Sequence, residues 1–209
     1  MGPTRIQSPV RGIWSFMNPP GHHPDAKDFV AVNEKGMPYD IAKVILHLFY
    51  KLPVTGTYAW EKEIFSPFDG EVITAEDNAP DRMDLNILRD LVKGLILAPR
   101  NGKNDIGYFL GNYVILKSGD GVLALLAHLR QGSVTVKKGM KVTAGELIAK
   151  VGNSGNTIQP HLHFQVMEEN DLSQAIPIPF VFESGEVGNN GSWKSSSSRL
   201  PQNYQRFRV

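Results

Sequence analysis

Short apolar blocks separated by turn residues run along much of the chain. Blocks of this kind, rich in β-branched residues and bounded by Gly, Asn and Asp, are typical of β-strands. The predicted strand segments are 28–33, the strand that follows an Asp-Gly turn within 65–75, 112–117, 122–129, 133–136, 147–151 and the block that follows Pro160. Because many of them recur at intervals of roughly ten residues, we expect a mainly β protein whose antiparallel sheet is closed or sandwiched on itself.

Two segments follow the helical period instead. Apolar residues recur at spacings of three and four over 41–52, where Asp40 is a good N-cap and Pro53 a stop. A second segment over 81–98 has the same spacing, with Asp81 in the cap position. The pattern therefore predicts two helices inserted into a strand-rich chain.

The C-terminal segment has a different composition. Residues 185–198 are rich in Gly, Asn and Ser, which predicts one domain over 1–183 followed by a flexible tail over 184–209. Trp193, Arg199 and other basic and aromatic residues of the tail could contact nucleic acid. A solvated tail that packs a few aromatic side chains back onto the domain is the interpretation we favour.

Charge and cysteine content narrow the function classes. The 209 residues carry 22 Lys and Arg against 21 Asp and Glu, so no overall field favours nucleic acid or an anionic membrane. Cysteine is absent, which leaves His, Asp and Glu as ligands for a transition metal.

The sequence also gives an expectation about location. No apolar run reaches membrane-spanning length, and residues 1–16 lack the basic-then-apolar plan of a signal peptide. We expect no membrane span and a cytoplasmic location as the chain stands, or a periplasmic or extracellular one if a leader has been removed. The oligomeric state is left open.

The chain has six histidines, and most fall at predicted strand ends or in one Pro-rich loop. They are His22, His23, His47, His128, His161 and His163. A Gly/Asn-rich turn and Pro160 precede the pair His161 and His163. Alternate side chains of a strand share a face, so these two imidazoles should project together, where they can share a metal or a substrate. A chance pair on a half-exposed strand is the alternative.

A catalytic zinc site without cysteine usually has three nitrogen or oxygen ligands and one open position. The side chains that meet this count are Asp28, one of His22 and His23, and one of His161 and His163. Two histidines then remain for proton transfer and for stabilising a developing oxyanion, and His128 and His161 are the candidates. This division predicts a metal-assisted hydrolysis.

Four spaced blocks resemble the lysostaphin-type (LytM-like) M23 family of zinc metallopeptidases. The blocks are Gly21 to Phe29, Pro67 to Val72, Ala127 to Leu129, and Gly152 to Phe164. The resemblance extends over roughly residues 20 to 180, and the spaced combination is far more specific than any single block.

The resemblance implies a mainly antiparallel β domain of the duplicated-hybrid-motif type, with a groove. It implies one zinc ion bound by the first-motif histidine, Asp28 and His163, with catalytic roles for His128 and His161. The family hydrolyses glycine-containing or stem-peptide cross-links of bacterial peptidoglycan, so the expected partner is a peptide or peptidoglycan substrate.

The first motif departs from the family pattern of three residues between His and Asp. Four residues separate His23 from Asp28, and five separate His22 from Asp28. In an extended segment the even offset of six puts His22 and Asp28 on one face, whereas His23 needs a bulge. We favour His22 as the metal ligand and keep His23 open.

Two other functions fit parts of the sequence. A non-catalytic relative of the same fold could bind a cell-wall or protein partner, but such relatives usually lose ligand residues, and a full set is present here. A lipoyl- or biotinyl-carrier fold should show lysine beside methionine at a hairpin tip, and Lys35-Gly36-Met37 does not match that pattern.

Overall fold

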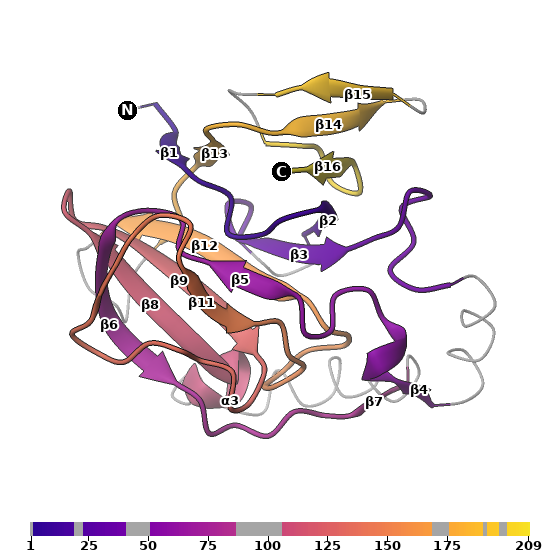
Figure 1. The fold of residues 1–209 in the computed structure, drawn as a ribbon, viewed down its shortest axis with the longest axis horizontal. Helices are drawn as coiled ribbons and strands as arrows, with labels where there is room; N and C mark the ends of the chain where they lie inside the picture. Colours follow the sequence, from indigo (N-terminus) through magenta and orange to yellow (C-terminus); the bar gives the residue numbers. More distant parts are fainter. Residues whose placement is uncertain are drawn as a thin grey trace.

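A computed structural model describes seven stretches of the chain: residues 2–18, 23–40, 51–86, 106–168, 176–189, 192–196 and 200–209. Their dominant feature is one ten-stranded sheet in which every neighbouring pair is antiparallel (Figure 1). In sheet order the strands are β10 (Lys141–Val142), β6 (Gly70–Glu76), β8 (Asn112–Ser118), β9 (Val122–Leu129), β12 (Leu162–Glu168), β3 (Lys27–Ala31), β2 (Ile13–Met17), β16 (Arg206–Arg208), β14 (Glu186–Asn189) and β15 (Ser192–Ser195). The predicted mainly β, antiparallel architecture is confirmed.

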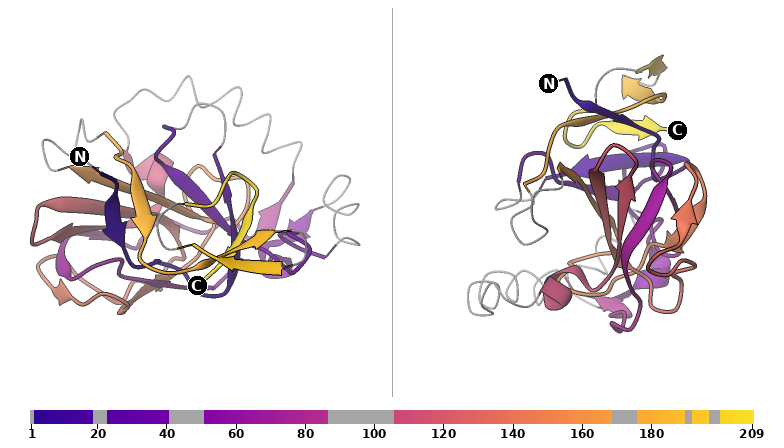
Figure 2. Two further views of the ribbon diagram at one scale, coloured as in Figure 1. Left: turned by 90° about the horizontal axis from the view of Figure 1, so that it is seen from above. Right: turned by 90° about the vertical axis from the view of Figure 1, so that its left-hand side faces the viewer.

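Three two-stranded pairs complete the strand structure. β1 (Thr4–Ile6) runs parallel to β13 (Phe180–Phe182), while β11 (Leu147–Lys150) pairs with β5 (Glu63–Phe65) and β4 (Leu52–Pro53) with β7 (Asp84–Leu85). A 3-10 turn spans Val54–Gly56, and the short helix α3 spans Ile106–Leu110. Both termini lie with β14, β15 and β16 at one end of the molecule, and α3 lies at the other (Figures 1 and 2).

A stack of phenylalanine rings forms the centre of the core beneath the middle of the sheet. Phe16 of β2 lies with its ring centroid 4.7 Å from that of Phe29 on β3 and 4.7 Å from that of Phe207 on β16. Phe29 in turn lies 5.6 Å from Phe164 of β12. Strands β3 and β12, which carry Asp28 and His163, are therefore held in place by one shared aromatic core.

The predicted helices differ from the structure wherever it describes them. Leu52 belongs to strand β4, and Leu85 lies in strand β7, where both are buried in a small cluster with Val54 and Tyr39. The helical spacing had placed these apolar residues on one face of a helix. In the structure they pair in strands and pack in this cluster instead. The remainder of the two predicted helices, 41–50 and 87–98, lies outside the described residues.

Two local predictions also need correction. Residues 133–136 form no strand, because a turn closed by the Ser133 N–H donating to the Arg130 carbonyl redirects the chain there. The last two residues of the predicted loop over 101–107 belong to helix α3, and residues 101–105 lie outside the described part of the chain.

The described C-terminal residues contain three strands of the large sheet. β14 and β15 form a hairpin, and β16 pairs with both β14 and β2. Phe207 is buried in the aromatic core, which holds β16 in the sheet. Trp193 packs against the guanidinium groups of Arg206 and Arg208, whose carbons Cζ lie 5.3 and 4.6 Å from its ring centroid. The aromatic residues thus pack back onto the domain, as favoured above.

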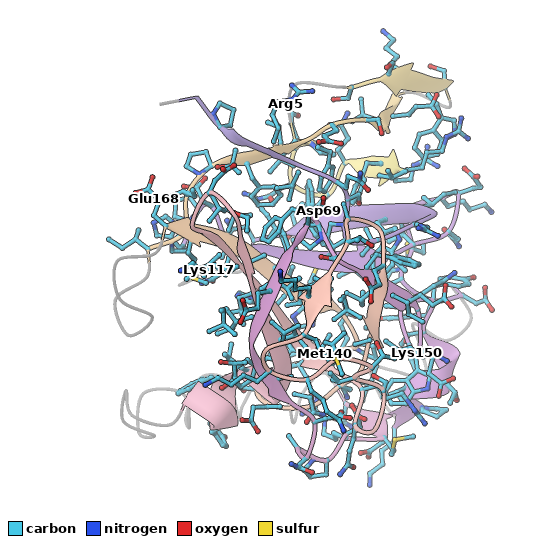
Figure 3. The ribbon with its side chains drawn as sticks, turned by 60° about the vertical axis from the view of Figure 1, so that its left-hand side comes forward. Arg5, Asp69, Lys117, Met140, Lys150 and Glu168 are labelled. Carbon is cyan, nitrogen blue, oxygen red and sulfur yellow. The ribbon has the colours of Figure 1, made fainter. Side chains whose placement is uncertain are left out.

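Figure 3 shows Glu168, at the end of β12, extending outward from the body of the protein. Within the described ranges, no helix is long and apolar enough to span a membrane.

Candidate functional site

Strand β12 separates an apolar face from a histidine face. Leu162, Phe164 and Val166 are buried in the core, while His163 and Gln165 lie on the opposite side with partial exposure. This is the period of two expected of a strand, and it forces His163 away from the core. The backbone of β12 therefore presents the imidazole on the face of the sheet opposite the phenylalanine stack.

The strand order brings three distant parts of the sequence to this face. β12 lies between β9 and β3, and His163 pairs in register with Ala127 on one side and with Asp28 on the other. His128 follows Ala127 directly. The sheet thus assembles the site from segments more than 130 residues apart, because Asp28 and His163 are separated by 135 positions.

Asp28 and His163 form the closest side-chain pair of the site. Nδ1 of His163 lies 2.8 Å from Oδ1 of Asp28, and the two side chains are 12% and 3% exposed. Nε2 of His163 lies 3.2 Å from Oε1 of Gln165. A buried carboxylate is costly without a charged or hydrogen-bonding partner, so the imidazole stabilises its ionised form.

His161 lies just before β12 and reaches the same carboxylate. Its Nδ1 lies 2.8 Å from the Gln159 carbonyl oxygen and 3.1 Å from Oγ1 of Thr157. Since the carbonyl can only accept, Nδ1 carries the proton and a neutral ring has its lone pair at Nε2. Nε2 is buried without a hydrogen-bond partner in the described part of the structure, 3.6 Å from Oδ1 of Asp28. Such an atom is a candidate for contact with a substrate, water or ion.

His128 is the third imidazole of the cluster. Its ring centroid lies 4.6 Å from that of His161 and 5.9 Å from that of His163. Burial lowers the pKa of His128 well below its ordinary value, and the neighbouring imidazoles of His161 and His163 lower it further. His128 is therefore neutral at pH 7 and can accept a proton.

Four of the predicted site residues thus lie together: Asp28, His128, His161 and His163. His23 lies in a turn where its Nδ1 accepts a hydrogen bond from the Asp25 N–H at 3.2 Å, with its side chain 39% exposed. His22 and His47 lie outside the described residues. Within the ranges that the structure describes, no group of three His, Asp or Glu side chains forms a metal site.

Several residues around the histidines were missed by the sequence reasoning. Asp81, predicted to cap a helix, instead accepts hydrogen bonds from the backbone N–H groups of Gln131 and Asn153, at 2.8 and 2.6 Å. Ser154 and Gln159 contribute backbone carbonyls to His128 and His161. The only sequence signal for the last two was the Gly/Asn-rich turn that leads into β12, because backbone atoms leave no residue-specific pattern.

The model of peptidase family M23 matches residues 55–175. The chain belongs to peptidase family M23. The matched segment contains His128, His161 and His163, and it begins after Asp28, so it includes the histidine side of the cluster and leaves the first motif outside. The family resemblance drawn from the sequence is confirmed.

Two curated relatives align with part of this family member. The peptidoglycan DD-endopeptidase ShyA of Vibrio cholerae is 34% identical over 74 residues, which cover 35% of this chain and 16% of ShyA. The glycyl-glycine endopeptidase ALE-1 of Staphylococcus capitis is 33% identical over 96 residues, 44% of this chain and 26% of ALE-1. The alignments therefore cover about a quarter or less of either relative.

The chain is also similar to solved structures of peptidases. A zinc-containing peptidase from Vibrio cholerae is 20% identical with a TM-score of 0.45, covering 82% of this chain and 38% of that one. Lysostaphin from Staphylococcus simulans is 18% identical with a TM-score of 0.45, covering 78% of this chain and 47% of that one.

Proposed function

We propose that this M23 family member is a zinc-dependent endopeptidase that hydrolyses peptide bonds of peptidoglycan, in its cross-links or stem peptides. Family membership supports peptidase activity. The names of the two aligned relatives, a peptidoglycan DD-endopeptidase and a glycyl-glycine endopeptidase, support the substrate class. The observation that carries the proposal is the cluster of three imidazoles beside the buried carboxylate of Asp28.

The donor set suits zinc. Asp28 and His163 offer an oxygen and a nitrogen that already lie 2.8 Å apart, on two paired strands held by the core. A cysteine-free catalytic zinc site needs one further nitrogen or oxygen ligand and one open position. We assign the third ligand to the first motif and prefer His22 to His23, because Nδ1 of His23 already accepts a hydrogen bond from the Asp25 N–H.

Zinc at these residues would supply two kinds of chemistry, lowering the pKa of a water molecule toward neutrality and polarising the carbonyl of the scissile bond. His161 is oriented to serve beside it, because its Nε2, which has no hydrogen-bond partner among the described residues, lies 3.6 Å from Oδ1 of Asp28. Nε2 can take a proton from the attacking water or donate a hydrogen bond to the developing oxyanion once protonated.

His128 completes the proton-transfer pair. Its ring lies 4.6 Å from that of His161 between centroids, so both imidazoles can reach one substrate group. Being neutral, His128 can accept a proton and later give it to the leaving amine. A binding protein without catalytic activity is the weaker alternative, because it would have no need for two buried imidazoles besides the proposed ligands.

The experiment that tests this function measures hydrolysis of peptidoglycan of two kinds, one cross-linked through glycine bridges and one through direct stem-peptide links. Mass spectrometry of the released fragments identifies the new amine and carboxylate ends. We expect cleavage of at least one kind by zinc-loaded protein and none by His161→Ala. No cleavage of either kind by zinc-loaded wild-type protein would overturn the proposal.

A further inference from the structure

The backbone carbonyl of Ser154 contacts one ring nitrogen of His128. Nδ1 of His128 lies 3.0 Å from this oxygen. A carbonyl oxygen only accepts, so Nδ1 must carry the proton, and in a neutral imidazole the lone pair is then confined to Nε2. Building on the peptidase function proposed above, we propose that Ser154 is a positioning residue that fixes His128 in the tautomer able to accept a proton at Nε2.

The Ser154 side chain holds that carbonyl in place. Its fully buried hydroxyl donates to the carbonyl of Leu129 at 2.7 Å and accepts from the N–H of Asn112 at 3.0 Å. Leu129 directly follows His128 on β9, and Asn112 begins β8. One hydroxyl therefore links the turn that orients the imidazole to the strand that carries it.

The backbone of Ser154 packs closely against that of Gly111. Gly111 has a left-handed φ of +63°, and a Cβ at that position would lie 2.4 Å from the Ser154 carbonyl carbon. Only glycine allows the two backbones to approach this closely. The Ser154 carbonyl is consequently fixed by packing on one side and by its own hydroxyl on the other.

Asp81 holds the two turns on either side of this contact. Oδ1 of Asp81 accepts from the N–H of Asn153, directly before Ser154, and Oδ2 accepts from the N–H of Gln131, three residues after His128. Asp81 also forms a backbone bridge with Ser154. A carboxylate that accepts from both turns keeps the distance between His128 and Ser154 constant.

His128 itself needs this support. Its φ is +61°, a left-handed conformation that is unfavourable for a residue with a Cβ. Such conformations persist only where surrounding contacts hold the backbone in place, and they are concentrated at functional sites. The contacts of Ser154 and Asp81 provide that constraint around His128.

The test compares Ser154→Ala with Ser133→Ala as a matched control. Oγ of Ser133 also joins two backbone segments near the end of β9, donating to the Arg130 carbonyl at 2.7 Å and accepting from the Lys150 N–H at 3.1 Å. It makes no hydrogen bond to any histidine that the structure describes. For each zinc-loaded protein we would measure kcat, KM, zinc content and the ¹⁵N shifts of the His128 ring, which distinguish the two tautomers.

We expect His128 of the wild type to carry its proton at Nδ1. In Ser154→Ala we expect the ring to become a mixture of tautomers and kcat to fall about tenfold or more, with KM and zinc content unchanged. Ser133→Ala should keep the wild-type tautomer and kcat. If Ser154→Ala does not fold, Asp81→Asn takes its place, because it retains the shape of the side chain and weakens one of the two contacts.

A proton on Nε2 in the wild type, or an unchanged tautomer and kcat in a folded Ser154→Ala, would overturn the positioning role. The ring measurement also separates this proposal from the peptidase function. If zinc-loaded wild type cleaves no peptidoglycan, the function fails, and a tautomer change in Ser154→Ala alone still supports the role of Ser154.

Discussion

Nδ1 of His163 and Oδ1 of Asp28 lie 2.8 Å apart although 135 positions separate the two residues in the chain. The contact follows from the register of β3 against β12, in which the two residues are direct partners. Phe29 and Phe164, the next residue on each strand, point the other way into the core with their centroids 5.6 Å apart. The aromatic core thus sets the spacing of the proposed metal ligands.

His128→Ala should separate catalysis from metal binding. We expect zinc content near that of the wild type and a fall in kcat of about 10²- to 10⁴-fold, the range for loss of a general acid or base. Paired measurements of zinc content and peptide hydrolysis check this. Wild-type turnover in the variant would remove His128 from the mechanism.

Removal of the metal should lower stability as well as activity. A ligand present at a thousand times its Kd stabilises the folded state by about 4 kcal/mol, so chelator-treated protein should melt at a lower temperature and regain its Tm on addition of zinc. Thermal unfolding with and without zinc measures this. Equal Tm values in both conditions would argue against zinc binding by the folded protein.

Phe207→Ala should destabilise the whole domain, because the ring lies 4.7 Å from Phe16 between centroids and is buried in the core. The expected loss of unfolding free energy is about 3–5 kcal/mol. Tyr204→Ala is the matched control, since Tyr204 is 73% exposed and its loss should change the free energy by about 0.5 kcal/mol or less. Urea unfolding of both variants measures the difference, and equal stabilities would mean that residues 184–209 form a tail independent of the core.

Gly111→Ala should be strongly destabilising for a local reason. The added Cβ would meet the Ser154 backbone at 2.4 Å, and φ is +63°. Gly119→Ala is a control, because a Cβ there meets nothing within 4 Å. We expect a loss of about 1–3 kcal/mol for the first substitution and little change for the second, measured by urea unfolding. Equal losses would show that the close approach to Ser154 is unimportant.

The strand-rich class and most of the central strands could be predicted from the sequence, because the period of two and the turn residues are local signals. The segment 122–129 and strand β9 (Val122–Leu129) coincide. In the described part of the predicted helix over 81–98, residues 81–86, the helical spacing misled because Leu85 lies in a short strand and in a small cluster with Leu52. Local periodicity cannot show which distant segment will cover an apolar residue.

For the site, the residue types and blocks could be predicted, whereas the contacts could not. Metal chemistry and the family resemblance were enough to group Asp28 with His163. Their direct contact depends on the register of β3 against β12, which pairs residues 135 positions apart and leaves no local signal. The contact of His128 with Ser154 involves a backbone carbonyl, which no side-chain pattern reveals. The flexible tail predicted from composition stays a prediction, and the burial of Phe207 in the core could not be predicted from that composition.

The most direct test of the proposed site is the zinc content of purified His163→Ala, measured by atomic spectroscopy beside wild type and His128→Ala. We predict about one zinc per chain in the wild type and in His128→Ala, and little in His163→Ala, because a three-ligand site does not survive loss of one ligand. Full zinc occupancy in a folded His163→Ala would contradict the assignment.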